Sequence, residues 1–277
     1  MGDGIHPSAV IDPRAEIGDG VVVGPYSVVG PEVRLEAGVE LGNHVTLEGR
    51  VVVGPQARIG HGSVLGGPPQ DLKYKVGTAS GLRIGARTVI REHVTIHRAT
   101  RADGWTEIGA DCLIMSTSHI AHDCRVGDGA IIINYVGITG HCEIGERATI
   151  GGFTGVIPFC RVGAHAYVGG YSKITQDVPP YMLADGSPAL AHGVNVIGLR
   201  RAGMPPADRR LLQDAYRILY RGGLSPRGAI ERIRADMPAA PVLAALLAFI
   251  ETSRRGICGS AGDVEGETWQ VDHEQVT

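Results

Sequence analysis

The sequence predicts an all-β solenoid, a parallel β-helix of hexapeptide repeats that ends in a small α-helical domain. Two observations lead to this prediction. Branched aliphatic residues recur at every sixth position from Ile5 to Leu65 and again from Ile108 to Ile174, a period that fits neither an α-helix nor an alternating strand. Aromatic residues make up only 5% of the chain while glycine contributes 41 residues, so stacked aliphatic side chains must fill the interior.

Each hexapeptide has a second inward position, which holds a small or compact residue. In the second run these residues are Cys112, Ser118, Cys124, Ala130, Val136, Cys142, Ala148, Thr154, Cys160, Ala166 and Ser172. Four of the five cysteines belong to this set, so we expect buried thiols, and neither disulfides nor metal ligands. Glycines that follow the aliphatic residue, such as Gly24 and Gly60, are expected to serve the corners through a positive φ or a close backbone approach.

The register breaks in two places, and both breaks predict loops inserted into the solenoid. The first covers residues 66–83 and carries Gln70, Asp71 and Lys73, whose side chains offer hydrogen-bond donors and acceptors close together. The second is the polar segment 98–107. Long excursions from a rigid scaffold commonly carry function, which favours a binding role for the first loop.

The solenoid is expected to end near residue 180, because the two prolines there cannot continue strand pairing. We therefore divide the chain into a β-helix over residues 1–185, a helical domain over 186–255 and a tail over 256–277. The tail contains five acidic residues and no lysine or arginine, so we expect it to be disordered.

Apolar periodicity predicts three helices in the second domain. The first runs from Pro206 to the Gly222-Gly223 pair, the second opens at Ser225, and the third covers residues 242–250. Residues 199–235 contain nine arginines and three acidic residues, which gives this segment a net charge of +6 in a chain whose total is −3. Such a surface is suited to an acidic protein partner.

Composition excludes several classes of function. A net charge of −3 gives the whole chain no attraction to nucleic acid or to an anionic membrane. The N-terminus does not resemble a signal peptide, and no apolar run approaches the ~18 residues that a membrane span requires. We expect a cytoplasmic protein without nucleic-acid partners, integral membrane contact or a cofactor.

The strongest signal for chemistry is the stretch His119-Ile120-Ala121-His122-Asp123-Cys124. Ile120 and Cys124 occupy the two inward positions, whereas His122 occupies neither and can point away from the packed interior. Two imidazoles beside a carboxylate are suited to proton transfer. This stretch is therefore the predicted catalytic centre.

Four further strings accompany this stretch. They are Gln70-Asp71-Leu72-Lys73-Tyr74, Val94-Thr95-Ile96-His97-Arg98, Gln176-Asp177-Val178-Pro179-Pro180-Tyr181, and Gly193-Val194-Asn195 followed by Gly198-Leu199-Arg200-Arg201. On these strings the chain resembles, to about residue 255, the UDP-N-acetylglucosamine O-acyltransferase family of lipid A biosynthesis. The resemblance implies a left-handed β-helix and a homotrimer with active sites between subunits. It also implies transfer of a (3-hydroxy)acyl group from acyl carrier protein to the 3-position of a UDP-N-acetylglucosamine-type nucleotide sugar.

The resemblance also implies roles for individual residues. His122 matches the general base, Asp123 the group that holds its tautomer, and the amide of Gly140 the oxyanion donor. The positions matched to sugar or phosphate contacts are Gln70, Asp71, Lys73, His119 and His141. Asn195 and Arg201 match the nucleotide contacts, and Gly170 and Tyr167 match the acyl-chain pocket; no metal is implied.

The chain departs from the family pattern around the acceptor. Ile157 and Pro158 stand where the family has His and Gln, and Tyr135, Ile197 and Ala202 each replace a polar residue. Every such change removes a hydrogen-bonding group, typically worth ~1 kcal/mol. The acceptor therefore stays open, and the alternative is an N-acyltransferase that acts on a nucleotide-linked amino sugar.

Two other classes of function remain as alternatives. His97, His119, His122 and His141 could supply imidazoles to zinc, as in the hexapeptide carbonic anhydrases. That family lacks the string in the first loop and the helical domain. A trimeric scaffold without catalysis is the second alternative, and the intact pair of His122 and Asp123 argues against it.

Overall fold

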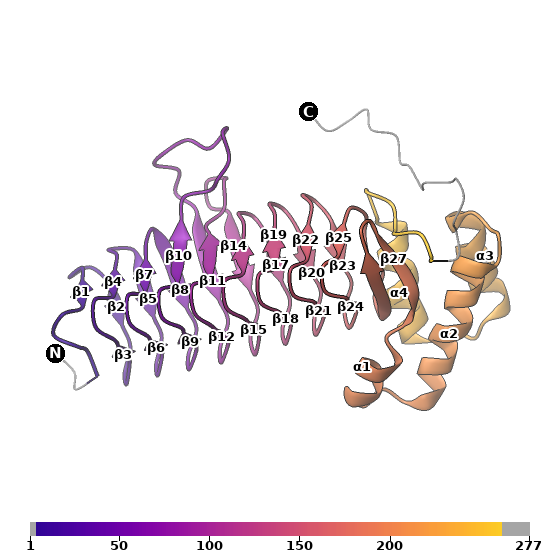
Figure 1. Cartoon of the computed structure of the whole chain (residues 1–277), viewed down its shortest axis with the longest axis horizontal. Helices are drawn as coiled ribbons and strands as arrows, with labels where there is room; N and C mark the ends of the chain where they lie inside the picture. The colour runs from indigo at the N-terminus through magenta and orange to yellow at the C-terminus, as the bar shows by residue number, and fades with distance from the viewer. Residues whose placement is uncertain (1–3, 262–277) are drawn as a thin grey trace.

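The computed structural model describes residues 4–261, which form a three-sided left-handed parallel β-helix with a helical domain at one end (Figure 1). Sheet B contains β1 (Val10–Ile11), β4 (Val28–Val29), β7 (Thr46–Leu47), β10 (Val64–Gly67), β13 (Thr95–His97), β16 (His119–Ile120), β19 (Gly137–Ile138), β22 (Gly155–Val156) and β25 (Lys173–Ile174). Sheet C contains β2 (Glu16–Ile17), β5 (Val33–Leu35), β8 (Arg50–Val53), β11 (Gly81–Ile84), β14 (Trp105–Ile108), β17 (Arg125–Val126), β20 (Glu143–Ile144) and β23 (Arg161–Val162).

Sheet A has the most strands of the three, and its last two strands form the end of the solenoid next to the helical domain. It contains β3 (Val22–Val23), β6 (Glu40–Leu41), β9 (Arg58–Ile59), β12 (Val89–Ile90), β15 (Leu113–Ile114), β18 (Ile131–Ile132), β21 (Thr149–Ile150), β24 (Tyr167–Val168), β26 (Met182–Gly186) and β27 (Ala189–Val194). All pairings among β3 to β26 are parallel, and only β26 and β27 pair antiparallel.

Consecutive coils stack in register, so the inward residue of each strand lies on its counterpart three hexapeptides later. Ile120 pairs with Ile138, and Ile138 pairs with Val156, all almost fully buried. Burial of such a side chain contributes roughly 1.5–3 kcal/mol, which compensates for the small number of aromatic residues. The prediction of buried thiols is confirmed for Cys112, Cys124, Cys142 and Cys160, which are free and buried, as is Cys258.

The corner glycines allow close contact between coils. A Cβ on Gly60 would lie 2.5 Å from the backbone of Arg91, a distance that real side chains do not reach. Positive φ angles occur two residues later in the turn, at glycines such as Gly62 and at residues that carry side chains, including Asp123, His141 and Phe159. Equivalent side chains then stack along each corner, which offsets the cost of the left-handed conformation.

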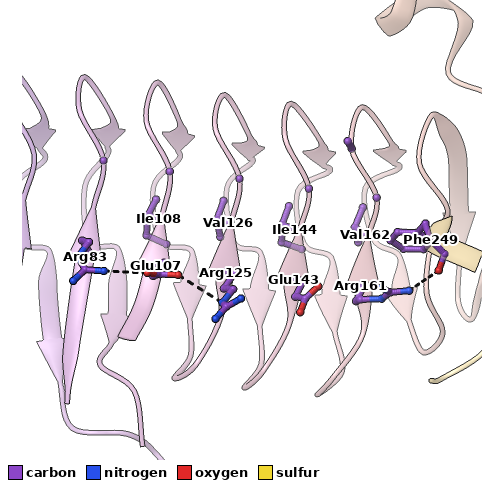
Figure 2. A pocket seen from close by; sticks show the side chains of 16 residues that line it. Arg83, Glu107, Ile108, Arg125, Val126, Glu143, Ile144, Arg161, Val162 and Phe249 are labelled. Carbon is purple, nitrogen blue, oxygen red and sulfur yellow. Dashed lines mark hydrogen bonds and ion pairs between the residues drawn. The ribbon is translucent and has the colours of Figure 1, made fainter. Parts of the chain in front are cut away.

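The outward face of sheet C is a ladder of alternating charge. Arg83, Glu107, Arg125, Glu143 and Arg161 succeed one another on adjacent strands (Figure 2). The carboxylate of Glu107 lies 3.1 Å from the guanidinium of Arg83 and 3.6 Å from that of Arg125. A shallow groove of about 550 Å³ runs along this ladder to α4, and none of the predicted site residues lines it.

The helical domain contains α1 (Val196–Arg201), α2 (Pro206–Arg221), α3 (Pro226–Asp236) and α4 (Pro241–Glu251). The last three confirm the predicted helices, and the side chain of Ser225 caps α3 as expected. The short α1 was not predicted, because its six residues show no apolar periodicity; the side chain of Asn195 accepts a hydrogen bond from Gly198 N and caps it.

Two predicted boundaries are wrong. Residues 186–194 do not belong to the helical domain, because β27 pairs with β26 and extends sheet A. Residues 256–261 are not disordered: Ile257 and Cys258 are buried, and Ile257 forms a β-bridge with Asp177. The rest of the predicted tail, 262–277, lies outside the described residues.

A buried ion pair fastens the helical domain to the last coil. Asp177, whose side chain is 1% exposed, lies 3.0 Å from Arg161 Nε and accepts a hydrogen bond from Ser253 Oγ at 2.8 Å. Arg161 also donates to the carbonyl of Phe249 in α4 at 2.7 Å. The carboxylate therefore links β23, α4 and the segment that follows α4.

We expect Asp177→Ala to destabilise the protein by about 3–5 kcal/mol, because it leaves the guanidinium of Arg161 partly buried and unpaired. Chemical denaturation with circular dichroism measures the change. Glu107→Gln is the control, because it breaks two exposed ion pairs on the same face and should cost about 1 kcal/mol or less. Equal losses in the two variants would contradict the role given to Asp177.

Candidate active site

The predicted catalytic stretch lies at the corner between sheets B and C. His122 follows β16, and its Nδ1 is 2.9 Å from Asp123 Oδ2. The two side chains are only 12% and 6% exposed. This geometry holds the proton on Nδ1 and leaves Nε2 of His122 as the free basic atom.

The carboxylate of Asp123 is held from a second side. Its Oδ2 accepts hydrogen bonds from the backbone N–H of Thr100 at 3.1 Å and from the Thr100 hydroxyl at 2.7 Å. Burial alone would raise the pKa of Asp123, but the hydrogen bonds from His122 and Thr100 outweigh burial and lower that pKa to about 2. Asp123 is therefore ionised at any physiological pH.

Gly140 lies one coil further along the same corner, against the imidazole of His122. A Cβ at this position would lie 2.5 Å from Cε1 and 2.7 Å from Nε2 of His122, so only glycine leaves room for the ring. Among residues 4–261, no group accepts a hydrogen bond from the Gly140 N–H. A free amide thus lies beside the basic nitrogen.

Three further histidines surround this pair. His141 stacks on Phe159 with ring centroids 4.7 Å apart and meets His122 edge to face at 5.1 Å. On sheet B, His119 Nδ1 bonds the hydroxyl of Thr95 at 2.7 Å, and its ring meets that of His97 at 4.8 Å.

Burial keeps these outer imidazoles neutral. It lowers the pKa of His119 and His141, and it lowers that of His97 to about 4 with help from the charges of neighbouring histidines. Within the described part of the chain, His97 Nδ1 is buried without a hydrogen-bond partner.

The first inserted loop reaches this corner. Asp71 is close enough to His141 for its negative charge to oppose the lowering of the His141 pKa. Its Oδ1 also accepts a hydrogen bond from the backbone N–H of Lys73 at 2.8 Å, so Asp71 stabilises the turn of the loop in addition. Arg98 fastens the loop by donating to Gly66 O at 2.6 Å and to the Tyr74 hydroxyl at 3.3 Å.

The remaining predicted residues lie elsewhere on the chain. Gly170 lies at the corner between sheets A and B, on the opposite side of sheet B from His122. Tyr167 is on β24 of sheet A. Asn195 and Arg201 lie at the start and end of α1, at the far end of the solenoid (Figure 1). The amide of Asn195 is already used, because it caps α1 and donates to His165 O at 3.0 Å. One chain therefore does not bring these four residues to His122.

Sequence reasoning missed Thr100 as part of this site. The only signal was its place in the second inserted segment, for which no binding role was predicted. Thr95 and Arg98 belong to one of the quoted strings, but the contacts they make were not foreseen.

His122, Asp123 and His141 are the group of described residues best arranged to hold a metal, with ligand atoms within 4.8 Å of one another. However, Nδ1 of His122 and Oδ2 of Asp123 bond each other, and Oδ2 also accepts from Thr100. These contacts fit a base with its orienting acid better than a ligand set.

Within residues 4–261, no helix is long and apolar enough to span a membrane.

Comparison with known proteins gives a consistent family. Residues 177–258 match the family described as UDP N-acetylglucosamine O-acyltransferase, domain 2, and residues 106–140 and 141–176 match the bacterial transferase hexapeptide. LpxA from Acinetobacter baumannii superimposes with a TM-score of 0.89 at 40% identity, covering 92% of this chain and all of that one. The UDP-N-acetylglucosamine acyltransferase of Francisella novicida gives 0.89 at 36% identity, with 93% and 94% covered.

Two relatives extend the match at the level of sequence. The acyl-(acyl-carrier-protein)–UDP-N-acetylglucosamine O-acyltransferase of Thermodesulfovibrio yellowstonii is 44% identical over 255 residues, which cover 92% of this chain and 98% of the relative. The enzyme of the same name from Polynucleobacter asymbioticus is 52% identical over 261 residues, with 91% and 98% covered. On this identity and coverage, the chain belongs to the UDP-N-acetylglucosamine O-acyltransferase family.

Proposed function

We propose that this protein transfers a (3-hydroxy)acyl group from acyl carrier protein to the 3-hydroxyl of a UDP-N-acetylglucosamine-type nucleotide sugar. The observation that carries the proposal is the hydrogen-bonded pair of His122 and Asp123 beside the free N–H of Gly140. The names of the relatives support the same donor and acceptor. A cytoplasmic location is part of the same proposal.

The reaction follows from the geometry of these three residues. Nε2 of His122 removes the proton of the sugar hydroxyl while the oxygen attacks the thioester carbonyl, and Asp123 stabilises the imidazolium that forms. The carbonyl oxygen becomes an oxyanion, which accepts a hydrogen bond from the N–H of Gly140. Collapse breaks the C–S bond, and the imidazolium returns its proton to the departing thiolate.

The polar groups around His122 support a sugar and phosphate site. His119 and His141 present neutral imidazoles on either side of it, and the loop held by Arg98 carries Gln70, Asp71 and Lys73. The exposed amine of Lys73 suits the phosphates. Tyr135, which replaces a polar residue of the family pattern, lies at the corner between sheets A and B, away from His122, and stacks on Phe153.

We propose that the protein is a homotrimer in which a neighbouring copy completes each site. Outward residues on sheets A and B are mostly uncharged, including Val89, Leu113 and Ile131 on one sheet and Gly137 and Gly155 on the other. The ladder on sheet C is charged throughout and suits contact with solvent. A second copy that covers the uncharged faces would bring its own Arg201 and acyl-pocket residues to the His122 of its neighbour.

The basic surface of the helical domain supports docking of acyl carrier protein. On α2, Arg210, Arg217 and Arg221 lie along one exposed face, since their spacing follows whole turns of the helix. Arg217 is paired with Asp214 at 2.5 Å. Among the described residues, Arg210 and Arg221 have no acidic partner, so their charges are available to a negatively charged carrier.

We expect His122→Ala to remain folded and to lose acyl transfer by at least ~10²-fold, because only the base is removed. Steady-state assays with acyl carrier donors and UDP-N-acetylglucosamine measure the loss. Amino-sugar nucleotides assayed in parallel separate O-acylation from N-acylation, since a free amine depends less on a base. Activity within a few-fold of the parent would remove the proposed role of His122.

The acyl pocket is tested at Gly170. A Cβ built there would meet only Gly152 O at 3.1 Å and Gly152 N at 3.8 Å, so a side chain can extend into open space. Gly170→Met should shift the preference towards shorter donors, because each excluded methylene loses ~0.8 kcal/mol of burial. Competition between donors of different length gives the profile, and an unchanged profile would place Gly170 outside the pocket.

Docking is tested by charge reversal. Replacing both Arg210 and Arg221 by Glu should depress kcat/KM with acyl carrier donors by about tenfold at low salt, and less at high salt where screening is stronger. Short pantetheine thioesters, which lack the carrier, should react at the parental rate. An equal loss with both donors would show damage to the site and contradict the docking surface.

A further inference from the structure

The carboxylate of Asp123 has two competing neighbours besides His122. Thr100 donates its hydroxyl at 2.7 Å and its N–H at 3.1 Å to Oδ2, while His141 Nε2 lies 3.8 Å from the same oxygen. The terminal torsion of Asp is broad, so the side chain alone does not fix the direction of its oxygens. Without the Thr100 hydroxyl, the carboxylate would be free to turn between His122 and His141.

Thr100 is delivered to this place by an enlarged coil. Thr95 pairs with His119 at a separation of 24 residues, one hexapeptide more than in a regular coil. The extra residues form the connection from β13 to β14 that carries Thr100.

Several contacts hold that connection rigid. Ala99 N donates to Gly81 O at 3.2 Å, and the buried hydroxyl of Ser80 donates to Ala99 O. Beyond Thr100, the ring of Trp105 lies between the guanidiniums of Arg50 and Arg83, 4.5 and 3.9 Å from its centroid. The hydroxyl is therefore fixed relative to the solenoid before substrate binds.

We propose that Thr100 is a positioning residue that fixes the Asp123 carboxylate towards His122, so that Nε2 of His122 faces the acceptor hydroxyl. This inference rests on the proposed acyl transfer. Thr100 makes no contact with substrate in this role and acts only through Asp123. Hydrogen bonds to an ionised group are among the stronger ones, so the contact is expected to matter to the rate.

The test is Thr100→Val, which keeps the shape of the side chain and removes the donor. We expect kcat to fall about tenfold with KM within about twofold of the parent, in line with one lost hydrogen bond to a charged group. Thr100→Ser, which restores the hydroxyl, should recover the rate to within about threefold of the parent. In the background of Asp123→Asn, Thr100→Val should cause less than a further twofold loss, because the charge that Thr100 orients towards His122 has already been removed.

Thr88→Val is the matched control. Like the hydroxyl of Thr100, that of Thr88 bridges two coils, donating to Gly109 O at 2.7 Å, but Thr88 is fully buried and touches nothing at the active site. It should lower the unfolding midpoint without a change in kcat. If Thr100→Val does not fold, Thr100→Cys, with its weak S–H donor, takes its place.

Three results would overturn the proposal: a parental kcat in Thr100→Val, a lost rate that Thr100→Ser does not recover, or a full tenfold loss added to that of Asp123→Asn. The failure of the proposed function itself would look different. In that case His122→Ala and Asp123→Asn would retain activity, whatever the behaviour of Thr100.

Discussion

The structure depends on one constraint, the in-register stacking of coils through their inward aliphatic residues. Because Ile120 must lie on Ile138 and Ile138 on Val156, every other position is also fixed relative to its counterpart in the next coil. A corner side chain therefore always meets the same position one coil later. The ring of His122 consequently lies on Gly140, and a glycine there is both the space for the base and the source of a free N–H.

A perfectly repeated solenoid would offer the same environment at every corner, and an active site needs one corner that differs from the rest. The two insertions provide this difference. One brings Asp71 near His141, and the other brings Thr100 to the carboxylate of Asp123. Both insertions are anchored on the regular coils around them, so they add polar contacts to the corner without disturbing the hydrophobic register that supports it.

The sequence predicted most of the fold, because the inward positions are set by a local period that needs no knowledge of distant contacts. It missed α1, whose formation depends on one capping side chain, and residues 256–261, whose order comes from β-bridges to Asp177 and Ala191 far earlier in the chain. The contact between Thr100 and Asp123 joins two adjacent coils across 23 residues, and no spacing rule gives it. Tertiary contacts between an insertion and a corner are visible only in three dimensions.

The three faces of the solenoid differ in a way that bears on how the site is completed. Along sheet C, Glu107 and Glu143 alternate with Arg83, Arg125 and Arg161, and Glu107 pairs with the arginines on both of its sides. On sheets A and B most outward residues are uncharged, although Arg58 pairs with Glu40 on sheet A. On sheet B, Thr95 and Gly137 flank His119. The side of the corner that faces sheet B thus carries the imidazoles of His119 and His97, and the glycines Gly137 and Gly155 follow further along the sheet. A second copy seated on these faces would enclose the acyl chain between apolar surfaces and leave the hydroxyl and thioester at His122, where exclusion of water strengthens every hydrogen bond that the reaction uses.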